Sequence, residues 1–370
     1  MTWRYIDDDN VSGPVGLACD EFLVTRSAGS GETALRLYTY RSYAALVGRF
    51  QDPRAELDLD YCREKAYDVS RRPTGGGAII MGSDQLGVAL TLSTASPVSP
   101  TTRREMFQSF GSGVLEGLKM LGVSSAELGS RNDIAVGGRK VAGQGVLEHG
   151  SGALLYHCSV CIGLDFEEML RILKLPAAKL GKAGADAARR RMTTLREQLG
   201  RDVTLGETRE ALRAGFCSRF NVKTERRLLD EEEKNEVSRL ASGVYASEEW
   251  IFRRTPSPDM TGEGAVRGRD GVVQAYVTLA GRHIKDAALT GDFFAGPESV
   301  AAVEEKLRWV RAEKGAVEEA VAAGLAGVKE EEMDAGSLAG AVMKAAANAR
   351  ERVKGGESYS CFIPHDRQQD

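Results

Sequence analysis

The spacing of apolar residues along the chain alternates between a helical and a strand period. From residue 102 to 121 apolar residues recur every three to four positions, which predicts one helix with a single buried stripe. From 153 to 162 one set of alternate positions is apolar, which predicts a strand. A shorter helix is predicted over 166–173, because the pattern stops before Pro176.

Turn residues predict how these segments connect. Residues 77–92 predict a hairpin, because an apolar run, the turn residues Gly82 to Asp84 and a period-two run follow one another. A second hairpin is predicted around Gly137 and Gly138, since two glycines between strand arms favour a two-residue turn. The stretch 177–200 is rich in Ala, Gly, Lys and Arg, and we expect a mobile or surface segment there.

The chain has 370 residues, which is enough for two domains. The composition changes between 245 and 270, where two prolines interrupt regular structure. We therefore expect a first domain over 1–245, a linker over 246–260 and a smaller domain over 261–370. Strands near 273–279 and 284–289 and a helical region from Pro297 are predicted for the smaller domain, and the tail beyond 355 is predicted to be unstructured.

Composition narrows the class of protein. Hydrophobic residues make up 42% and charged residues 28%, as in ordinary globular proteins. The net charge of −4 argues against a nucleic-acid partner. No apolar run approaches the roughly 18–20 residues of a membrane span, so we expect no membrane partner. Six scattered cysteines predict free thiols in a reducing cytoplasm.

The first segment that suggests chemistry is 71–78, which reads Arg-Arg-Pro-Thr-Gly-Gly-Gly-Ala. Gly75, Gly76 and Gly77 leave backbone N–H groups open to cradle phosphate or carboxylate oxygens. Arg71 and Arg72 can supply a cationic fork suited to phosphate. A plain glycine-rich turn beside two solvated arginines explains the same residues, and no P-loop signature follows.

The second segment is the predicted hairpin that carries Lys140, followed by two further glycines. A lysine on a hairpin arm can reach a site as a compact positive charge, although a solvent-facing lysine is the simpler interpretation. His157, Cys158 and Cys161 suggest a zinc site. On a strand, however, Cys158 and Cys161 point to opposite faces, and no second pair of ligands is near in the sequence.

In their order and spacing these segments resemble lipoate-protein ligase A, a family of the biotin and lipoate protein ligase superfamily. The resemblance is carried by residues 71–78, by Arg-Asn-Asp at 131–133 and by Gly-Arg-Lys-Val-Ala-Gly at 138–143. It includes the segments 13–21 and 47–53. Segments at 247–256 and 291–294 resemble the C-terminal accessory domain of the long bacterial form, so the resemblance covers about residues 13–320.

The resemblance implies an α+β fold, with a mixed β-sheet catalytic domain flanked by helices and a smaller α+β accessory domain. It also implies a two-step reaction. Lipoate attacks the α-phosphate of ATP to give lipoyl-adenylate and pyrophosphate, and a lysine of an apo lipoyl domain then displaces AMP. The implied acceptors are lipoyl domains of 2-oxoacid dehydrogenase E2 subunits or the glycine cleavage H protein, and Mg²⁺ is expected with ATP.

The resemblance also implies roles for single residues. Lys140 matches the family lysine between the lipoate carboxylate and the α-phosphate, and is the implied catalytic residue. The implied ATP contacts are Arg72, Gly75, Gly76, Gly77, Ala78, Ile79, Ile80, Asp133 and Lys140. The implied lipoate contacts are Arg72, Lys140, Gly143 and His157, and the implied Mg²⁺ ligand is Asp133.

Other functions stay open. An octanoyltransferase would move an octanoyl or lipoyl group from acyl carrier protein through a cysteine thioester, without ATP. In related enzymes that cysteine lies just before the lysine hairpin, where residues 124–129 hold none. A biotin ligase is disfavoured because its Gly-Arg-Gly-Arg loop is absent. A non-catalytic lipoate-binding homologue is disfavoured by the presence of both Arg72 and Lys140. Gln144 and Cys158 depart from the family residues near the acyl pocket, so acyl preference is open.

Overall fold

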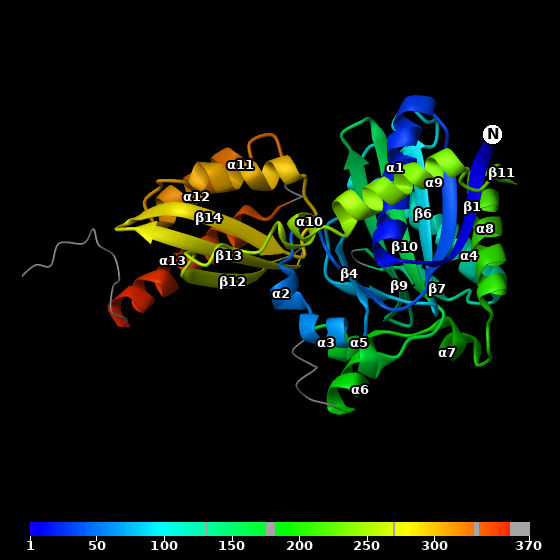
Figure 1. Ribbon diagram of the computed structural model, residues 1–370, viewed down its shortest axis with the longest axis horizontal. Coiled ribbons are helices and arrows are strands. Elements are labelled where there is room, and N and C mark those ends of the chain that lie inside the picture. Colours follow the sequence, from blue (N-terminus) through cyan, green and yellow to red (C-terminus); the bar gives the residue numbers. More distant parts are fainter. Residues whose placement is uncertain (130–131, 175–181, 269–270, 329–332, 356–370) are drawn as a thin grey trace, which may run out of the picture. The chain divides into compact units, whose positions relative to one another are not determined.

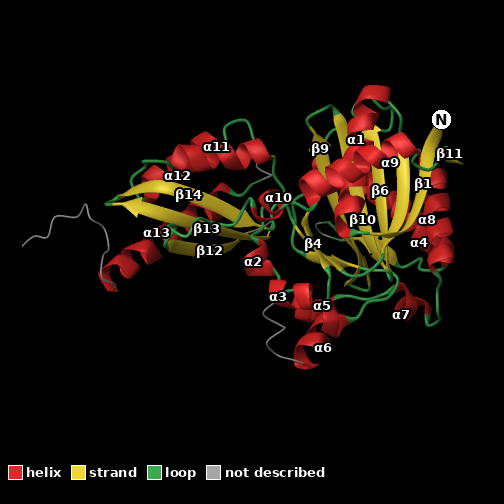
Figure 2. Cartoon of the chain, viewed as in Figure 1, coloured by secondary structure: helices red, strands yellow, loops and turns green. Residues whose placement is uncertain are grey.

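The computed structural model of the protein describes residues 1–129, 132–174, 182–268, 271–328 and 333–355. The chain divides into two compact units, Met1–Thr255 and Pro256–Asp370, which are described separately. Figure 1 and Figure 2 show the helices and strands of both units. The tail predicted to be unstructured and residues 177–181 of the predicted surface segment lie outside the described residues.

A mixed sheet of eight described strands forms the centre of the first unit, in the order β11-β1-β2-β6-β10-β9-β8-β7. The two pairs made by β1 are parallel, and the other pairs are antiparallel. The bounds are β1 Thr2–Val11, β2 Ala34–Tyr40, β6 Gln85–Ser93, β7 Ala126–Leu128, β8 Asp133–Val136, β9 Arg139–His149, β10 Ala153–Cys161 and β11 Lys223–Arg226.

Helices cover both faces of this sheet (Figure 1). On one face α4 (Arg103–Leu121) and α8 (Leu205–Phe220) pack against buried strand residues such as Trp3 and Leu90. The other face carries α1 (Gly13–Ser30), α9 (Glu231–Leu240) and a π-helical turn η2 (Ala241–Tyr245). This arrangement confirms the predicted α+β class with a helix-flanked mixed sheet.

The helix predicted over 102–121 is confirmed as α4. Its apolar stripe is buried at Met106, Phe110, Val114 and Leu118. Thr102 and Glu105 form a capping box that satisfies backbone donors at its first turn, and Gly122 ends it in a left-handed conformation. The predicted strand at 153–162 and the helix at 166–173 are confirmed as β10 and α5 (Phe166–Ile172).

The hairpin predicted over 77–92 is wrong. The strand β5 (Ile79–Met81) pairs with β3 (Ala44–Val47) in a small sheet of order β4-β3-β5, where β4 is Asp68–Arg71. The next strand, β6, pairs with β2 and β10 in the large sheet. The turn residues at 82–84 therefore carry the chain from one sheet to the other, because each strand finds a distant partner rather than its neighbour.

Short helices surround the small sheet and share a third apolar cluster with it. They include α3 (Leu59–Glu64), α5 and α6 (Lys182–Arg191). Helix α2 (Pro53–Glu56) precedes α3, and α7 (Leu195–Leu199) packs with the cluster that contains α4 and α8. The described part of the segment predicted to be mobile, residues 182–200, is therefore largely helical. Its few apolar residues suffice to anchor it, since Ala185 and Leu195 are buried.

The second unit is a three-stranded antiparallel sheet with helices. Two of its strands match the segments predicted at 273–279 and 284–289, whereas the first strand was not predicted. Its described strands are β12 (Gly262–Gly268), β13 (Gly271–Ala280) and β14 (His283–Gly291). Its described helices are α11 (Pro297–Leu307), α12 (Lys314–Gly324) and α13 (Ala335–Gly355). Residues 248–252, placed by sequence in the linker, form helix α10 (Glu248–Phe252) within the first unit. No helix of the described residues is long and apolar enough to cross a membrane.

Candidate functional site

The β9–β10 strand pair forms the floor of the candidate site. Gly143 lies opposite Ser159, and Gly145 lies opposite His157. A Cβ atom added to Gly143 would lie 2.8 Å from Nζ of Lys140, and one added to Gly145 would overlap the imidazole of His157. The side chains of Lys140 and His157 therefore pass over bare backbone of β9, an approach that glycine permits.

Lys140 is held at the start of β9 by a tight hairpin. Gly137 and Gly138 have φ values of 55° and 74°, so β8 and β9 form the hairpin that the sequence predicts. Nζ of Lys140 forms a 2.6 Å ion pair with Oδ1 of Asp133, the first residue of β8. The two side chains are 30% and 41% exposed, so an incoming anion or cation can compete for either partner.

The triple-glycine loop reaches the same floor through Thr74. Oγ1 of Thr74 and Nε2 of His157 lie 2.9 Å apart, in hydrogen-bond contact. Gly76 has a φ of 93°, and its carbonyl approaches Gly48 so closely that a Cβ atom on Gly48 would overlap it. The structure thus brings the two motifs together. Lys140 lies over Gly143, and the loop lies over the neighbouring Gly145.

The two arginines before the loop do not form the predicted fork. Arg72 is buried and donates to the carbonyls of Leu46 at 2.7 Å and Gly77 at 2.8 Å, which shapes the glycine loop from within. Burial lowers the pKa of Arg72 to about 10. Arg71 is buried as well, and its guanidinium donates to carbonyls of α10 and to those of Gly48 and Arg49.

His157 is neutral in this setting. Burial, with a smaller contribution from the charge of Arg72, lowers the pKa of the imidazole to about 3. Because the imidazole is neutral, it adds no second cation next to Arg72. An uncharged ligand group therefore fits beside it better than a charged one.

The predicted nucleotide-flanking residues Ala78, Ile79 and Ile80 lead into the small sheet. Ile79 pairs with Leu46 and Ile80 with Ala45 on β3. Ile79 packs with the cluster under α1, whereas Ile80 packs with the cluster around α5. Because the two side chains leave opposite faces of one strand, they cannot line the same wall of a nucleotide site.

Cys158 and Cys161 are buried free thiols on β10. Burial raises the pKa of Cys158 to about 12 and that of Cys161 to about 11, although the charge of Lys140 opposes both shifts. Both are therefore thiols rather than thiolates at neutral pH. No group of three or more His, Cys, Asp or Glu side chains among the described residues could hold a metal ion.

Sequence reasoning did not single out Thr74, Gly145 or Gly48 as site residues, although Thr74 and Gly48 lie in segments that resemble the family and Gly145 follows such a segment by two residues. The alternating faces of a predicted strand could have placed His157 near a glycine partner. The contact with Thr74 could not be found this way, because it depends on how the loop folds over the sheet.

Comparison with known proteins identifies the architecture. The family model of the lipoyl protein ligase A/B catalytic domain matches residues 13–217, more than half of the chain. The chain belongs to this family. The match confirms the resemblance found in the sequence and makes the protein an enzyme of the lipoate ligase and transferase superfamily.

Individual members are similar over about two thirds of the chain. Octanoyltransferase LipM from Symbiobacterium thermophilum is 30% identical over 275 residues, which cover 68% of this chain and 98% of LipM. A bi-partite lipoate protein ligase from Thermoplasma acidophilum, studied with its E2 lipoyl domain, superposes with a TM-score of 0.62. It is 25% identical and covers 70% of this chain and 98% of its own. A lipoate-protein ligase A bound with ATP shares the fold, with a TM-score of 0.59 and 24% identity over 68% of this chain and 99% of its own.

Proposed function

We propose that the protein is an ATP-dependent lipoate-protein ligase. The observation that carries this proposal is the convergence of Lys140 and the triple-glycine loop on one glycine floor, joined by the contact between Thr74 and His157. A cation beside open backbone donors is what a reaction between a carboxylate and a polyanionic nucleotide requires, since charge repulsion and positioning dominate its barrier.

In the first step a lipoate carboxylate oxygen forms a bond to the α-phosphorus of ATP. The bond from that phosphorus to the bridging oxygen breaks, and pyrophosphate leaves with the electron pair. Lys140 stands where it can offset negative charge on both reactants, once they replace Asp133 as its partner. The glycine loop supplies N–H groups without side chains that would block the nucleotide.

In the second step the ε-amine of an acceptor lysine attacks the acyl carbonyl. The new C–N bond replaces the C–O bond to AMP, and the amine loses a proton. Lys140 can polarise the same carbonyl or phosphate oxygen. The neutral His157 adds no charge next to the acyl chain, whose burial would contribute about 0.8 kcal/mol per methylene.

Asp133 fits a role beside Mg²⁺. Magnesium commonly binds through one or two carboxylates together with substrate phosphates, rather than through an all-protein cage. The Asp133 carboxylate is 41% exposed, and it would be released when phosphates take over Lys140. Mg²⁺ held there would neutralise phosphate charge.

The proposed acceptors are lipoyl domains of 2-oxoacid dehydrogenase E2 subunits, or the glycine cleavage H protein. The similarity to the ligase from Thermoplasma acidophilum, which was studied with its E2 lipoyl domain, supports the first of these.

Octanoyl transfer from acyl carrier protein is the second candidate, because the curated relatives include LipM octanoyltransferases. That chemistry passes through a cysteine thioester. The sequence has no cysteine between Cys62 and Cys158, a stretch that includes the whole approach to Lys140. The two thiols on β10 are buried with raised pKa values, which makes them poor nucleophiles. These features favour activation by ATP.

The intact mass of an apo lipoyl domain, measured after incubation with each acyl donor, tests the proposal. With ATP, Mg²⁺ and lipoate we expect one lipoyl addition and release of pyrophosphate, and Lys140→Ala should abolish most of both. Octanoyl transfer from acyl carrier protein without ATP, lost in Cys161→Ser, would establish the transferase instead. Failure with both donors would leave a non-catalytic lipoate-binding protein.

A further inference from the structure

Arg71 is a fully buried cation whose hydrogen-bond partners are backbone carbonyls. It donates to Gly48 at 3.0 Å and to Arg49 at 2.7 Å on one side, and to Ile251 at 2.6 Å on the other. Burial lowers its pKa to about 9, and the nearby charges of Arg253 and Arg254 act in the same direction. Burying a charge without a counter-ion is costly, so several carbonyls are needed to hold it.

These bonds connect helix α10 to the backbone that supports the glycine loop. Arg71 bonds to the backbone of residues 48–49. This backbone in turn bonds to the loop, because the amide of Arg49 donates to the carbonyl of Thr74 at 2.9 Å. Helix α10 also bonds back to Arg71, because Nε1 of Trp250 donates to the carbonyl of Arg71 at 2.8 Å. A shift of α10 would therefore reach Thr74 through two contacts. Arg71 bonds α10 to the backbone of residues 48–49, and Arg49 bonds that backbone to Thr74.

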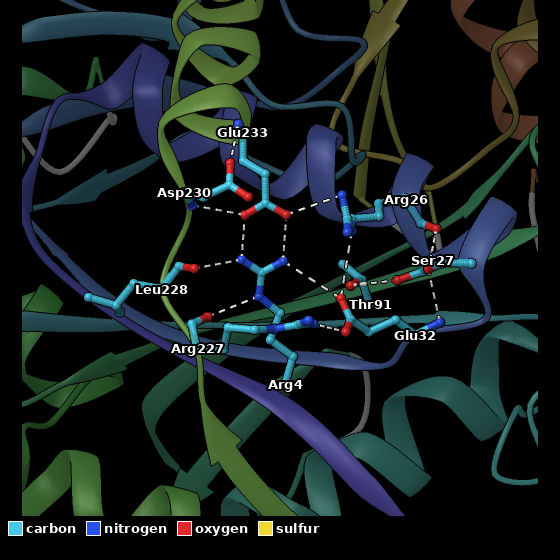
Figure 3. A network of polar contacts seen from close by, with 10 residues as sticks. Arg4, Arg26, Ser27, Glu32, Thr91, Arg227, Leu228, Asp230 and Glu233 are labelled. Carbon is cyan, nitrogen blue, oxygen red and sulfur yellow. Dashed lines mark hydrogen bonds and ion pairs between the residues drawn. The ribbon is translucent and has the colours of Figure 1, made fainter.

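The helix α10 lies beyond residues 13–217, which the family model matches. The chain reaches it through β11, α9 and η2, and this returning segment is bonded to β1 at Arg4. Figure 3 shows this contact, in which Arg4 donates to both carboxylate oxygens of Glu233 at 2.8 and 2.6 Å. A second tie, from Oγ of Ser70 to the carbonyl of Tyr245 at 2.7 Å, lies next to Arg71.

We propose that Arg71 and Trp250 are positioning residues, which fix the glycine loop for the nucleotide by bonding it to helix α10. The inference rests on the proposed use of that loop for ATP. According to this proposal, a residue beyond the matched range 13–217, Trp250, helps to hold the glycine loop in place. Arg71, the first arginine of the motif, then positions the loop rather than contacting phosphate.

Three variants separate positioning from general stability. Trp250→Phe keeps an aromatic ring and removes the indole N–H that bonds to Arg71. Arg71→Lys keeps a charge and removes the guanidinium fork. Arg4→Lys is the matched control, because Arg4 is also a buried arginine that bonds to the same returning segment. Its contacts there are with residues 227–233 rather than with α10.

The kinetic readout is pyrophosphate release by the full chain with ATP and lipoate. We expect Trp250→Phe to raise the KM for ATP about five-fold, the effect of losing one hydrogen bond, with the KM for lipoate unchanged. Arg71→Lys should raise it further. Arg4→Lys should lower the melting temperature and leave the KM for ATP unchanged. An unchanged KM for ATP in Trp250→Phe, or an equal rise in Arg4→Lys, would overturn the inference.

Amide hydrogen exchange gives a readout that does not depend on the substrate. Exchange at residues 74–78 should be faster in Trp250→Phe and Arg71→Lys than in the native protein, and unchanged in Arg4→Lys. Unchanged loop exchange in the first two variants would refute the positioning role. If the native protein releases no pyrophosphate while loop exchange responds as expected, the proposed function fails and the coupling of α10 to the loop stands.

Discussion

Gly143→Ala should lower activity without lowering stability. The new methyl group would lie 2.8 Å from Nζ and 2.9 Å from Cε of Lys140. Ordinary van der Waals contact for such atoms is about 3.5 Å, so the ammonium group must retreat by roughly 0.7 Å. A misplacement of about 1 Å at a reacting centre can cost on the order of 10²-fold, so we expect roughly a 10-fold loss in the rate of pyrophosphate release.

The same substitution should leave stability unchanged or raise it. Gly143 lies inside β9 without a left-handed φ, and the atoms nearest to the new methyl are the movable end of a lysine. Alanine also reduces the conformational entropy of the unfolded chain, which is worth about 0.4–1 kcal/mol at a compatible position. Activity and stability are therefore expected to move in opposite directions.

The assay combines pyrophosphate release at saturating ATP and lipoate with thermal unfolding of each variant. Gly150→Ala is the control, since Gly150 lies in the turn between β9 and β10 and a Cβ atom there meets nothing within 4 Å. It should leave the rate unchanged, and it should raise the stability by no more than the same roughly 0.4–1 kcal/mol, because Gly150 also lacks a left-handed φ. A native rate in Gly143→Ala would show that the position of Lys140 over this glycine is irrelevant to the reaction. A loss of rate accompanied by a large drop in melting temperature would refute the steric reasoning.

Two further substitutions test the loop and the imidazole. Gly48→Ala places a methyl group against the carbonyl of Gly76, which is backbone and cannot rotate away, so the glycine loop should shift and the KM for ATP should rise by on the order of 10-fold. Steady-state kinetics at varied ATP check this, and a native KM would contradict the close packing of the two segments. His157 has its pKa lowered to about 3, so between about pH 3 and 6.5 the unfolded chain binds a proton that the folded chain does not. Its contribution to folding stability therefore falls as the pH drops through that window, by about 2 kcal/mol at about pH 5. Urea unfolding near pH 5 and pH 7 should show a smaller difference for His157→Gln than for the native protein, and equal differences would argue against a buried neutral imidazole.

Local signals in the sequence were sufficient where neighbouring residues determine the structure. The hairpin that carries Lys140 is an example, because two consecutive glycines select its turn whatever lies around it. Helix α4 is another, since its stripe, its capping box and its C-terminal glycine all lie within the segment. In both cases the elements form as predicted. In the hairpin, the turn also determines where Lys140 lies along its strand.

Prediction failed where the partner is remote. The strand β5 looked like half of a hairpin with β6, but its pairing with β3 depends on residues 33 or more positions earlier, at Ala45 and Leu46. Arg71 looked like a phosphate ligand, but its partners on α10 lie 179 and 180 residues away in the sequence. A charged residue beside a glycine run gives the same local pattern whether it binds a ligand or supports the loop.

The glycines of this chain lead us to expect that the site is sensitive to small substitutions. Glycine accounts for 42 of the 370 residues, well above the usual level of about 7%, and several of them stand where one chain segment passes directly over another. Lys140 over Gly143, His157 over Gly145 and Gly76 over Gly48 are three such crossings in one site. At each crossing the position of a functional group is set by contact with bare backbone rather than by a side chain that could adapt. A single added methyl group therefore acts on the position of a reacting group directly. The same change at a glycine that meets nothing, such as Gly150, should have no such effect. Glycines such as Gly143, which another segment contacts, maintain the geometry of the site. Glycines such as Gly150, which contact nothing, affect at most the stability of the fold.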